Sequence, residues 1–549
     1  MPTVTLNKKV FEQLVGKKLD LSELKDRISM LGTDLESIEG NDINVEIFPN
    51  RPDMLSEQGF ARAFSSFIGA KPGLREYKVE KSGEKIIIDK SVSKVRPFTS
   101  CAIIKNLKFD DEKIREIIQI QEKLHVTYGR NRKKVAIGVY PMEKIKFPVT
   151  FFAEDPKKVK FQPLEFPREI TGLQILSQHP TGRDYSHLLE GLTQFPFFKD
   201  ANNKILSMPP IINSHDVGKI SETTTEVFIE CSGFDYGVLA KCLNMIVTAL
   251  ADMGGKIYSL ELKYDKKSIT SPDLSPSKMK FSLDYINRRL GLNLKEQDAQ
   301  KLLSRMGFGY DKSSKSALIP SYRTDLLHQI DLAEDIAIAY GYENFEEIIP
   351  DVATVGEESK TESFKRRISE LLIGLSISEL YTYNITSDEI IEKKFKGRKP
   401  VMLKNSLSEE FNCLRSELIP ALLDVLTKNK HHEFPQNIFD IGQVFTKDSN
   451  EETGVKEQEH LAVALCDDKI DFTRIKQVLD YIFHNLDEKY DLKETKNSSF
   501  IEGRVGEIIV KGKKLGIIGE INPEILTNFD LEYPVAALEI NVSELYQLL

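Results

Sequence analysis

The apolar residues of this chain lie in many short runs, some at helical and some at strand spacing. No run approaches the ~18 consecutive apolar residues that a membrane-spanning helix requires, so we predict no association with a membrane. The chain must instead bury its apolar side chains in soluble cores. Because one core stops growing well below 549 residues, we expect an α+β multidomain protein with roughly three or four domains.

The first section, residues 1–90, is predicted to be a small N-terminal α+β domain. Apolar residues at helical spacing indicate one amphipathic helix across 11–31, and a strand follows over 43–48. This strand must end at the sequence Pro-Asn-Arg-Pro-Asp of 49–53, because proline cannot donate a ladder hydrogen bond. A second helix is expected to begin near Ser56.

The second section, residues 91–268, is predicted to be a mixed α/β domain. In its helix over 112–126, Gln121 falls on the apolar stripe, where a buried amide must find hydrogen-bond partners. Those partners are either neighbouring backbone groups or the polar groups of a pocket. The turn 129–134 carries four cations just before a strand over 135–140, and it is either an exposed basic turn or a docking point for a polyanion.

Polar residues also gather at 208–215 and 222–226, on either side of a turn that leads into an alternating strand over 227–231. Hydroxyls, amides and carboxylates then converge at the ends of apolar strands, as they do in substrate pockets. A polar hairpin would give the same pattern.

The second half of the chain contains two further predicted domains. In residues 269–347, Ser282 and Gly291 are typical caps on either side of a helix, and a second helix, a strand near 317–319 and a third helix complete a helix-turn-helix-like module. Residues 348–549 show successive strands that are separated by short turns and interrupted by helices, which must cover one face of a sheet. This pattern predicts a C-terminal α+β domain built on an antiparallel sheet.

An acidic stretch in the third section is the pattern with the most chemical content. If 329–341 is helical, three of its carboxylates share about 100° of arc, and a fourth precedes them in the turn. Like charges so close repel one another unless a positive group lies between them, and Mg²⁺ is a natural candidate because it prefers oxygen ligands. A solvated acidic helix face is the alternative. We call these residues the acidic quartet: Asp325, Asp331, Glu334 and Asp335.

Several classes of function are disfavoured by the sequence. It contains no glycine-rich phosphate loop, no His-Glu-x-x-His zinc motif and no Gly-x-Ser-x-Gly nucleophile. A net charge of −9 argues against a surface coated with nucleic acid. The five scattered cysteines predict reduced, mostly buried side chains. Because the N-terminus has no apolar signal core, we expect a cytoplasmic protein.

Four motifs occur in a fixed order along the chain. They are Pro49–Asp53; Pro320–Asp325 with the rest of the acidic quartet and Tyr340–Tyr342; Leu414–Ser416 with Pro420–Leu423; and Ile518–Glu524. Together they resemble the β subunit family of phenylalanyl-tRNA synthetases, in its archaeal and eukaryotic form. The resemblance covers nearly the whole chain.

The resemblance implies an aminoacyl-tRNA ligase that works with an α subunit as an (αβ)₂ heterotetramer and joins phenylalanine to tRNA-Phe at the expense of ATP. It implies that adenylation takes place on the α subunit, and that 348–549 is a class II synthetase-like domain that has lost this activity. Arg415 and Glu417 superficially match a class II Arg-x-Glu, but they run directly into a helix at Ile419. The resemblance also implies that the acidic quartet binds Mg²⁺, in a role that is either structural or linked to the subunit contact rather than catalytic.

For residues 91–268 the resemblance implies an editing domain, which hydrolyses tyrosine wrongly attached to the tRNA. Tyrosine adds one hydroxyl to phenylalanine, and an apolar pocket rejects an added hydroxyl by only ~10²-fold, so a second site must read it. Such a site needs a polar partner for the phenol, donors around the ester and a held water, with Arg132 holding the tRNA end or the carbonyl oxygen. The residues expected to build it are Gln121, Arg132, Asn213, Ser214 and Glu226.

Two alternatives to an editing subunit stay open on the sequence alone. The first is a non-catalytic scaffold that binds tRNA and the α subunit while its editing pocket is inactive. The second is a stand-alone metal-dependent hydrolase that uses the acidic quartet.

Overall fold

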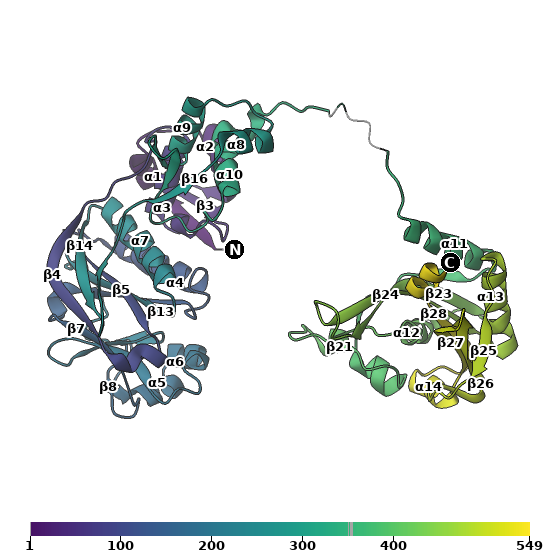
Figure 1. Cartoon of the computed structure of the whole chain (residues 1–549). Coiled ribbons are helices and arrows are strands. Elements are labelled where there is room, and N and C mark those ends of the chain that lie inside the picture. The colour runs from purple at the N-terminus through teal and green to yellow at the C-terminus, as the bar shows by residue number, and fades with distance from the viewer. Residues whose placement is uncertain (1, 350, 352–354) are drawn as a thin grey trace. The chain divides into compact units, whose positions relative to one another are not determined.

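The computed structural model describes residues 2–349, 351 and 355–549, and the chain divides into two compact units, Met1–Ile349 and Pro350–Leu549 (Figure 1). Among the described residues, no helix is long and apolar enough to cross a membrane. All five cysteines are free and buried, as predicted.

Short helices and an antiparallel sheet open the first unit. The elements are β1 (Thr3–Asn7), α1 (Lys8–Val15), α2 (Leu21–Met30), β2 (Asp34–Glu39), β3 (Asp42–Glu46) and α3 (Glu57–Phe67), and the strand order is β1-β3-β2. The Asn7 side chain caps α1, which ends at Gly16 with a φ of 79°. The Asp20 side chain then caps α2. The single helix predicted across 11–31 is therefore wrong, because these caps divide it into two.

A ten-stranded sheet forms the body of the first unit. Its strands are β4 (Val79–Ile88), β5 (Phe98–Lys105), β6 (Val135–Pro141), β7 (Val149–Glu154), β10 (Phe195–Lys199), β11 (Ile205–Met208), β12 (Ile212–Asn213), β13 (Val227–Gly233), β14 (Lys256–Lys263) and β15 (Ser268–Ser271). The order is β12-β11-β10-β7-β4-β14-β5-β13-β6, with β15 paired to β14. β4 runs parallel to β14 and β7, and the other pairs are antiparallel. β6 and β13 confirm the predicted strands over 135–140 and 227–231.

Along the chain, these strands are connected by the helices α4 (Asp111–Val126), α5 (Gly172–Gln178), α6 (Pro180–Tyr185) and α7 (Tyr236–Asp252). The strands β8 (Lys160–Phe161) and β9 (Ile170–Thr171) form a separate small pair. The apolar side chains of β13 alternate between two cores. Val227 and Ile229 pack in the core that contains α4 and α7, whereas Phe228 packs in a second core on the opposite face. Glu230 has the same parity as Phe228, so it faces away from α7.

The third section begins with β16 (Ser277–Lys280) and continues through α8 (Leu283–Leu290), α9 (Glu296–Arg305), β17 (Gly309–Asp311), β18 (Ser316–Ile319) and α10 (Gln329–Tyr340), with the strand order β16-β18-β17. Ser282 and Gly291 cap α8 as predicted. Side chains such as Phe64 of α3, Leu243 of α7 and Ile336 of α10 belong to one apolar core. Residues 1–90, 91–268 and 269–347 therefore form one compact unit, and β4 of the first section is a strand of the sheet of the second.

The second unit is built on a seven-stranded sheet with the order β19-β23-β24-β28-β27-β26-β25. Its elements are α11 (Lys360–Gly374), β19 (Ser378–Leu380), β20 (Ile385–Thr386), β21 (Val401–Met402), β22 (Cys413–Leu414), α12 (Ile419–Asn429), β23 (Gln436–Lys447), β24 (Val455–Cys466), α13 (Phe472–Asn485), β25 (Asp491–Glu494), β26 (Phe500–Val510), β27 (Lys513–Ile521), α14 (Pro523–Asn528), β28 (Val535–Asn541) and α15 (Val542–Leu548). Only the short β19 pairs in parallel, with β23. The predicted antiparallel sheet is thus confirmed for this unit.

Helices cover both faces of this sheet, so the expectation that they cover one face is wrong. Val463 of β24 packs in a core with α11, α13 and α15. Its neighbours Ala462 and Ala464 pack in a separate core with α12 and α14. A strand buried on both faces has a nearly continuous apolar sequence, and β24 shows this at 461–466.

Candidate functional site

Arg323 lies at the centre of a group of buried charges in the first unit, and its side chain is only 3% exposed. Its Nε and Nη2 donate to the two carboxylate oxygens of Asp325 at 2.8 and 2.7 Å, and Nη2 also donates to Oδ2 of Asp335 at 2.8 Å. Burial opposes the charge of the guanidinium, but the two carboxylates outweigh it and raise the pKa of Arg323 above its usual range. Arg323 therefore donates charge-assisted hydrogen bonds to two neighbouring carboxylates at once.

Two further buried arginines extend this group. Arg51 donates to both carboxylate oxygens of Asp53 at 2.9 Å. Arg62 donates to Oδ2 of Asp252 at 2.7 Å, and its guanidinium carbon lies 4.0 Å from the ring centre of Tyr322. The N-terminal elements, the end of α7 and the segment 320–325 thus meet in one network. We call it the buried ion network: Arg51, Asp53, Arg62, Asp252, Arg323, Asp325 and Asp335.

The acidic quartet is divided by this arrangement. Asp325 and Asp335 share Arg323, while Asp331 accepts hydrogen bonds from the backbone N–H groups of Leu327 and His328 at 2.7 and 2.8 Å. Glu334 is exposed. Among the residues that the structure describes, no group of three or more His, Cys, Asp or Glu side chains is placed to hold a metal ion. In this arrangement two of the four carboxylates bond to Arg323 and the other two lie apart from them, and the magnesium site stays a prediction.

A cavity of about 450 Å³ lies in the second section of the first unit, beside α4, β6 and β11. The structure brings three of the five predicted editing residues to its wall: Gln121, Arg132 and Asn213. The sequence left two kinds of partner open for Gln121, the backbone and a polar pocket, and both apply. Its Nε2 donates to the backbone carbonyl of Ile137 at 3.5 Å, and its side chain lines the cavity. The apolar part of the wall consists of Ile114, Ile118, Ala136, Ile137, Val139, Leu164, Pro209, Pro210, Ile211, Ile212 and Ile220.

Arg132 is held firmly at this cavity. Its Nη1 donates to the carbonyl of Ile211 at 2.8 Å and its Nη2 to Oε1 of Glu122 at 3.0 Å. Its guanidinium carbon lies 4.4 Å from the ring centre of Tyr185. The basic turn that carries it has φ values of 48°, 52° and 63° at residues 130, 131 and 132. Three consecutive non-glycine residues in the left-handed region are strained, and such strain concentrates at functional sites.

Ser214 and Glu226 do not line the cavity. Ser214 is buried, and its backbone N–H donates to the carbonyl of Leu206 at 2.7 Å. Glu226 forms an ion pair with Lys105 at 3.2 Å, just before β13 begins. These two residues were predicted from residue type and from their place in polar segments, but the backbone directs their side chains away from the cavity wall.

Glu230 is the main residue that the sequence analysis missed. It is 2% exposed in the middle of β13, lines the cavity, and its Oε1 accepts a hydrogen bond from the Tyr140 hydroxyl at 3.3 Å. Burial raises the pKa of Glu230 to about 8, although Arg96 and Tyr140 act in the opposite direction. The acid is therefore protonated near neutral pH. The signal in the sequence was a single carboxylate in an otherwise apolar strand over 227–231.

Gly138 makes room for this acid. A Cβ at Gly138 would lie 2.2 Å from the Tyr140 hydroxyl oxygen and 2.7 Å from Oε1 of Glu230. The Tyr140 hydroxyl also lies within hydrogen-bond distance of Oδ1 of Asn213, at 3.2 Å, so its single proton is donated to either Asn213 or Glu230. Tyr140 thus lies between the buried acid of β13 and the predicted Asn213 in β12.

Four buried polar atoms of the cavity-lining residues make no hydrogen bond of ordinary length and angle within the described part of the chain: Nε of Arg132, Nδ1 of His179, Oγ of Ser207 and Oε2 of Glu230. Buried polar atoms normally have partners, so a concentration of such atoms at one cavity needs an explanation. An apolar wall with several unpaired polar groups suits a ligand that has an apolar body and polar ends.

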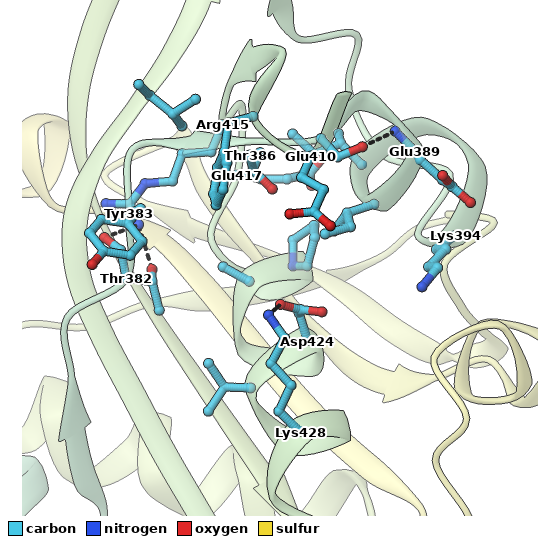
Figure 2. Close-up of a pocket in the computed structure, with 18 of the residues that line it drawn as sticks. Thr382, Tyr383, Thr386, Glu389, Lys394, Glu410, Arg415, Glu417, Asp424 and Lys428 are labelled. Atoms are coloured by element: carbon cyan, nitrogen blue, oxygen red, sulfur yellow. Dashed lines mark hydrogen bonds and ion pairs between the residues drawn. The ribbon is translucent and has the colours of Figure 1, made fainter. Parts of the chain in front are cut away.

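The second unit contains a larger cavity of about 800 Å³, which Figure 2 shows. Arg415 borders it but is bound within the fold, since its Nε donates to the carbonyl of Gln443 at 2.7 Å and its Nη1 to the Thr382 hydroxyl at 2.6 Å. The Glu417 carboxylate accepts a hydrogen bond from the backbone N–H of Arg398, and burial raises its pKa to about 7. Both side chains of the Arg-x-Glu sequence therefore make hydrogen bonds within the fold.

Two sequence models of known families match the chain between residues 279 and 542. Residues 279–342 match the model described as "tRNA synthetase B5 domain", and residues 346–542 match "Phenylalanyl tRNA synthetase beta chain CLM domain". The chain is similar to the phenylalanine–tRNA ligase beta subunits of Pyrococcus abyssi, with 37% identity over 100% of both chains, and of Archaeoglobus fulgidus, with 37% identity over 100% of this chain and 99% of the relative.

One solved structure extends the comparison to the first unit. It is an N-terminal fragment of the phenylalanyl-tRNA synthetase beta subunit from Pyrococcus horikoshii, with a TM-score of 0.59 and 35% identity over 62% of this chain and 99% of the fragment. The fold and the matched models define a chain of an aminoacyl-tRNA synthetase. Within that class, it belongs to the family of phenylalanine–tRNA ligase beta subunits.

We expect Arg323→Met to destabilise the first unit by about 3 to 5 kcal/mol, because it leaves two buried carboxylates without a counter-ion. Urea unfolding of the full chain, followed by circular dichroism, measures the change. Arg288→Met is the matched control, since Arg288 pairs with Asp284 at the surface and such pairs contribute only about 0 to 1 kcal/mol.

Removing metal ions with EDTA distinguishes charge balance by Arg323 from charge balance by a bound Mg²⁺. If Arg323 balances the charge of Asp325 and Asp335, EDTA should not change the urea unfolding curve of the unchanged chain. A large loss of stability in EDTA that Mg²⁺ restores, together with a small effect of Arg323→Met, would show that a metal and not the arginine neutralises the quartet.

We expect Glu230→Gln to change the pH dependence of stability. Between its ordinary value of 4.5 and about 8, Glu230 keeps its proton in the folded state and has lost it in the unfolded state. Stability therefore falls as pH rises through this window, by up to about 1.4 kcal/mol per pH unit, and glutamine removes this slope. Urea unfolding at pH 5, 6, 7 and 8 measures the difference between the two proteins, which should widen with pH.

Glu226→Gln is the control for this series, because Glu226 lies at the start of the same strand and pairs with Lys105 near the surface. Its stability should follow that of the unchanged chain across the series. Parallel curves for Glu230→Gln and the unchanged chain would mean that the buried acid titrates normally.

Proposed function

We propose that this chain acts in the cytoplasm as the β subunit of an (αβ)₂ phenylalanine–tRNA ligase. In this assembly the α subunit carries out adenylation with ATP, and both subunits contribute to binding tRNA-Phe. Membership of the family supports the ligase role. The internal hydrogen bonds of Arg415 support the assignment of adenylation to the partner, because an arginine that clamps ATP must be free to reach it.

The cavity around Glu230 is proposed to be an editing site that hydrolyses tyrosyl-tRNA. The observation that carries this proposal is the group of four unpartnered buried polar atoms at one cavity. A site that must distinguish tyrosine from phenylalanine has to present polar groups to one hydroxyl inside an otherwise apolar pocket. When phenylalanine occupies such a pocket, these groups stay unpaired, and binding is weaker.

The protonated carboxyl of Glu230 is the best-placed group to read the phenol. It both donates and accepts hydrogen bonds, and it lies next to the Tyr140 hydroxyl and Asn213. The apolar wall from α4 and β6 would contact the aromatic ring. Because the acid is buried and neutral, it would not repel the electron-rich ring of the substrate.

Arg132 is proposed to hold the ester end of the substrate. Its positive charge is fixed by Glu122 and Ile211, and it suits the terminal phosphate of the tRNA or the oxyanion that develops on the ester carbonyl. Gln121 and Ser207 supply further polar groups along the wall. A water held among these side chains would attack the ester carbon, and the 3′-terminal ribose hydroxyl would leave with a proton.

Deacylation of tyrosyl-tRNA by the assembled αβ complex tests this proposal. We expect the unchanged complex to release tyrosine from tRNA-Phe, and Glu230→Ala to slow the release by about 2- to 10-fold, because a hydrogen bond between neutral groups contributes about 0.5 to 1.5 kcal/mol. Acid-gel separation of charged and uncharged tRNA gives the rate.

Glu226→Ala is the matched control and should deacylate at the normal rate, since Glu226 lies outside the cavity. Charging with phenylalanine should stay unchanged in both variants, which excludes misfolding of the complex. Tyrosyl-tRNA that persists with the unchanged complex would instead favour the non-catalytic scaffold.

A further inference from the structure

Another cavity of the first unit, of about 380 Å³, is lined by α1, by α3 and by the segment 71–77, which leads into β4. It shares no lining residue with the cavity around Glu230, so the proposed editing function gives it no role. The residues of α3 that line it are three or four positions apart and therefore share one face of the helix. They are Gln58, Ala61, Arg62 and Ser65.

Two buried polar atoms on this helix face lack partners. Arg62 is 7% exposed, and its Nη1 donates to Tyr77 and Asp252 at 2.8 and 2.7 Å. Its Nη2 makes no hydrogen bond of ordinary length and angle among the described residues, and the same is true of Oε1 of Gln58, which is 6% exposed. Because buried polar atoms normally have partners, an unpaired donor and an unpaired acceptor at one cavity indicate a ligand that both accepts and donates.

Two further cations of the wall, Lys71 and Arg75, form no ion pair within the described part of the chain. The Lys71 ammonium donates to the carbonyl of Leu14 at 2.7 Å. Nη2 of Arg75 donates to the carbonyl of Lys71 at 3.2 Å and to Oγ of Ser65 at 3.4 Å. Since Ser65 follows Arg62 by three residues on α3, this contact places the Arg75 guanidinium along the helix face that carries Arg62.

The wall carries both signs of charge, with the positive sign in excess. Its cations are Arg62, Lys71 and Arg75, and its carboxylates are Asp252 and Glu76. Asp252 is already paired with Arg62, whereas Glu76 is exposed and forms no ion pair among the described residues. Three cations against two carboxylates leave one positive charge over. The wall is therefore complementary to a ligand that has anionic and cationic groups and one net negative charge.

An acidic α-amino acid has this combination of groups. Its α-carboxylate can accept hydrogen bonds from Nη2 of Arg62 and from Arg75, because guanidinium groups match the geometry of a carboxylate. Its ammonium can donate to the unpaired Oε1 of Gln58. Its side-chain carboxylate can accept from Lys71, which has three donors and uses one for Leu14. The cavity volume of about 380 Å³ lies near the small end of the usual range for ligand pockets.

We propose that this cavity binds a free acidic α-amino acid, with its α-carboxylate at Arg62 and Arg75 and its ammonium at Gln58. The bound molecule supplies partners for both unpaired buried atoms and balances the excess positive charge. Binding here and hydrolysis at the cavity around Glu230 use different residues. Failure of one proposal therefore leaves the other standing.

Isothermal titration calorimetry of the full chain with L-glutamate, at constant ionic strength, tests the proposal. We expect saturable binding at one site. Arg75→Gln should weaken this binding at least about tenfold, because it removes a charged donor to the α-carboxylate. The matched control is Arg168→Gln, which removes the same charge from an exposed position outside the cavity and should leave the affinity unchanged.

Glutarate has both carboxylates of L-glutamate but no ammonium group, and we expect it to bind the unchanged chain at least about tenfold more weakly. Gln58→Met keeps the test independent of folding. It removes an acceptor that has no partner, so the urea midpoint without ligand should not fall, whereas the affinity for L-glutamate should fall and that for glutarate should not.

Absence of saturable L-glutamate binding to the unchanged chain would overturn the proposal. Equal affinities of Arg75→Gln and Arg168→Gln for L-glutamate would also overturn it. The same holds if the unchanged chain binds glutarate as tightly as L-glutamate, since the site would then recognise negative charge alone.

Discussion

The bidentate contact between Arg323 and Asp325, with Asp335 bound to the same guanidinium, is the constraint on which the first unit depends. Two aspartates so close cannot both stay charged in a buried place without a cation, and the chain supplies that cation two residues before the first of them. The adjacent Tyr322 lies under Arg62, which binds Asp252 at the end of α7. One short segment therefore connects the N-terminal elements, the large sheet and α10.

Local rules predicted much of the fold. Ser282 and Gly291 defined α8 to the residue, and alternation located β6 and β13. One error was local, because the caps at Gly16 and Asp20 divide the helix predicted across 11–31, and the others came from long-range packing. β4 leaves the N-terminal section to pair with β14, and helices bury both faces of the C-terminal sheet, because partners distant in sequence decide which strand faces are covered.

The candidate site was predicted in part, for reasons that particular residues make clear. Gln121 was identified because an amide on an apolar stripe needs partners, and Arg132 because cations cluster at a strand end. Ser214 was chosen for its proximity to Asn213, although neighbours on an extended chain point in opposite directions. Glu230 was missed, since alternation cannot distinguish a solvent-facing acid from one that faces a cavity between covered elements. The spacing of the acidic quartet suggested a positive group among all four carboxylates, whereas the fold places Arg323 beside Asp325 and Asp335 alone.

The central functional claim is that the cavity around Glu230 recognises the hydroxyl of a tyrosyl ester. The most direct test is the affinity of the full chain for two non-hydrolysable adenosine analogues, one carrying a 3′-tyrosylamide and the other a 3′-phenylalanylamide, measured by calorimetry. The account predicts that the tyrosyl analogue binds about tenfold more tightly or better, and that Glu230→Ala abolishes this difference. Equal affinities for the two analogues in the unchanged chain, or tighter binding of the phenylalanyl analogue, would contradict it.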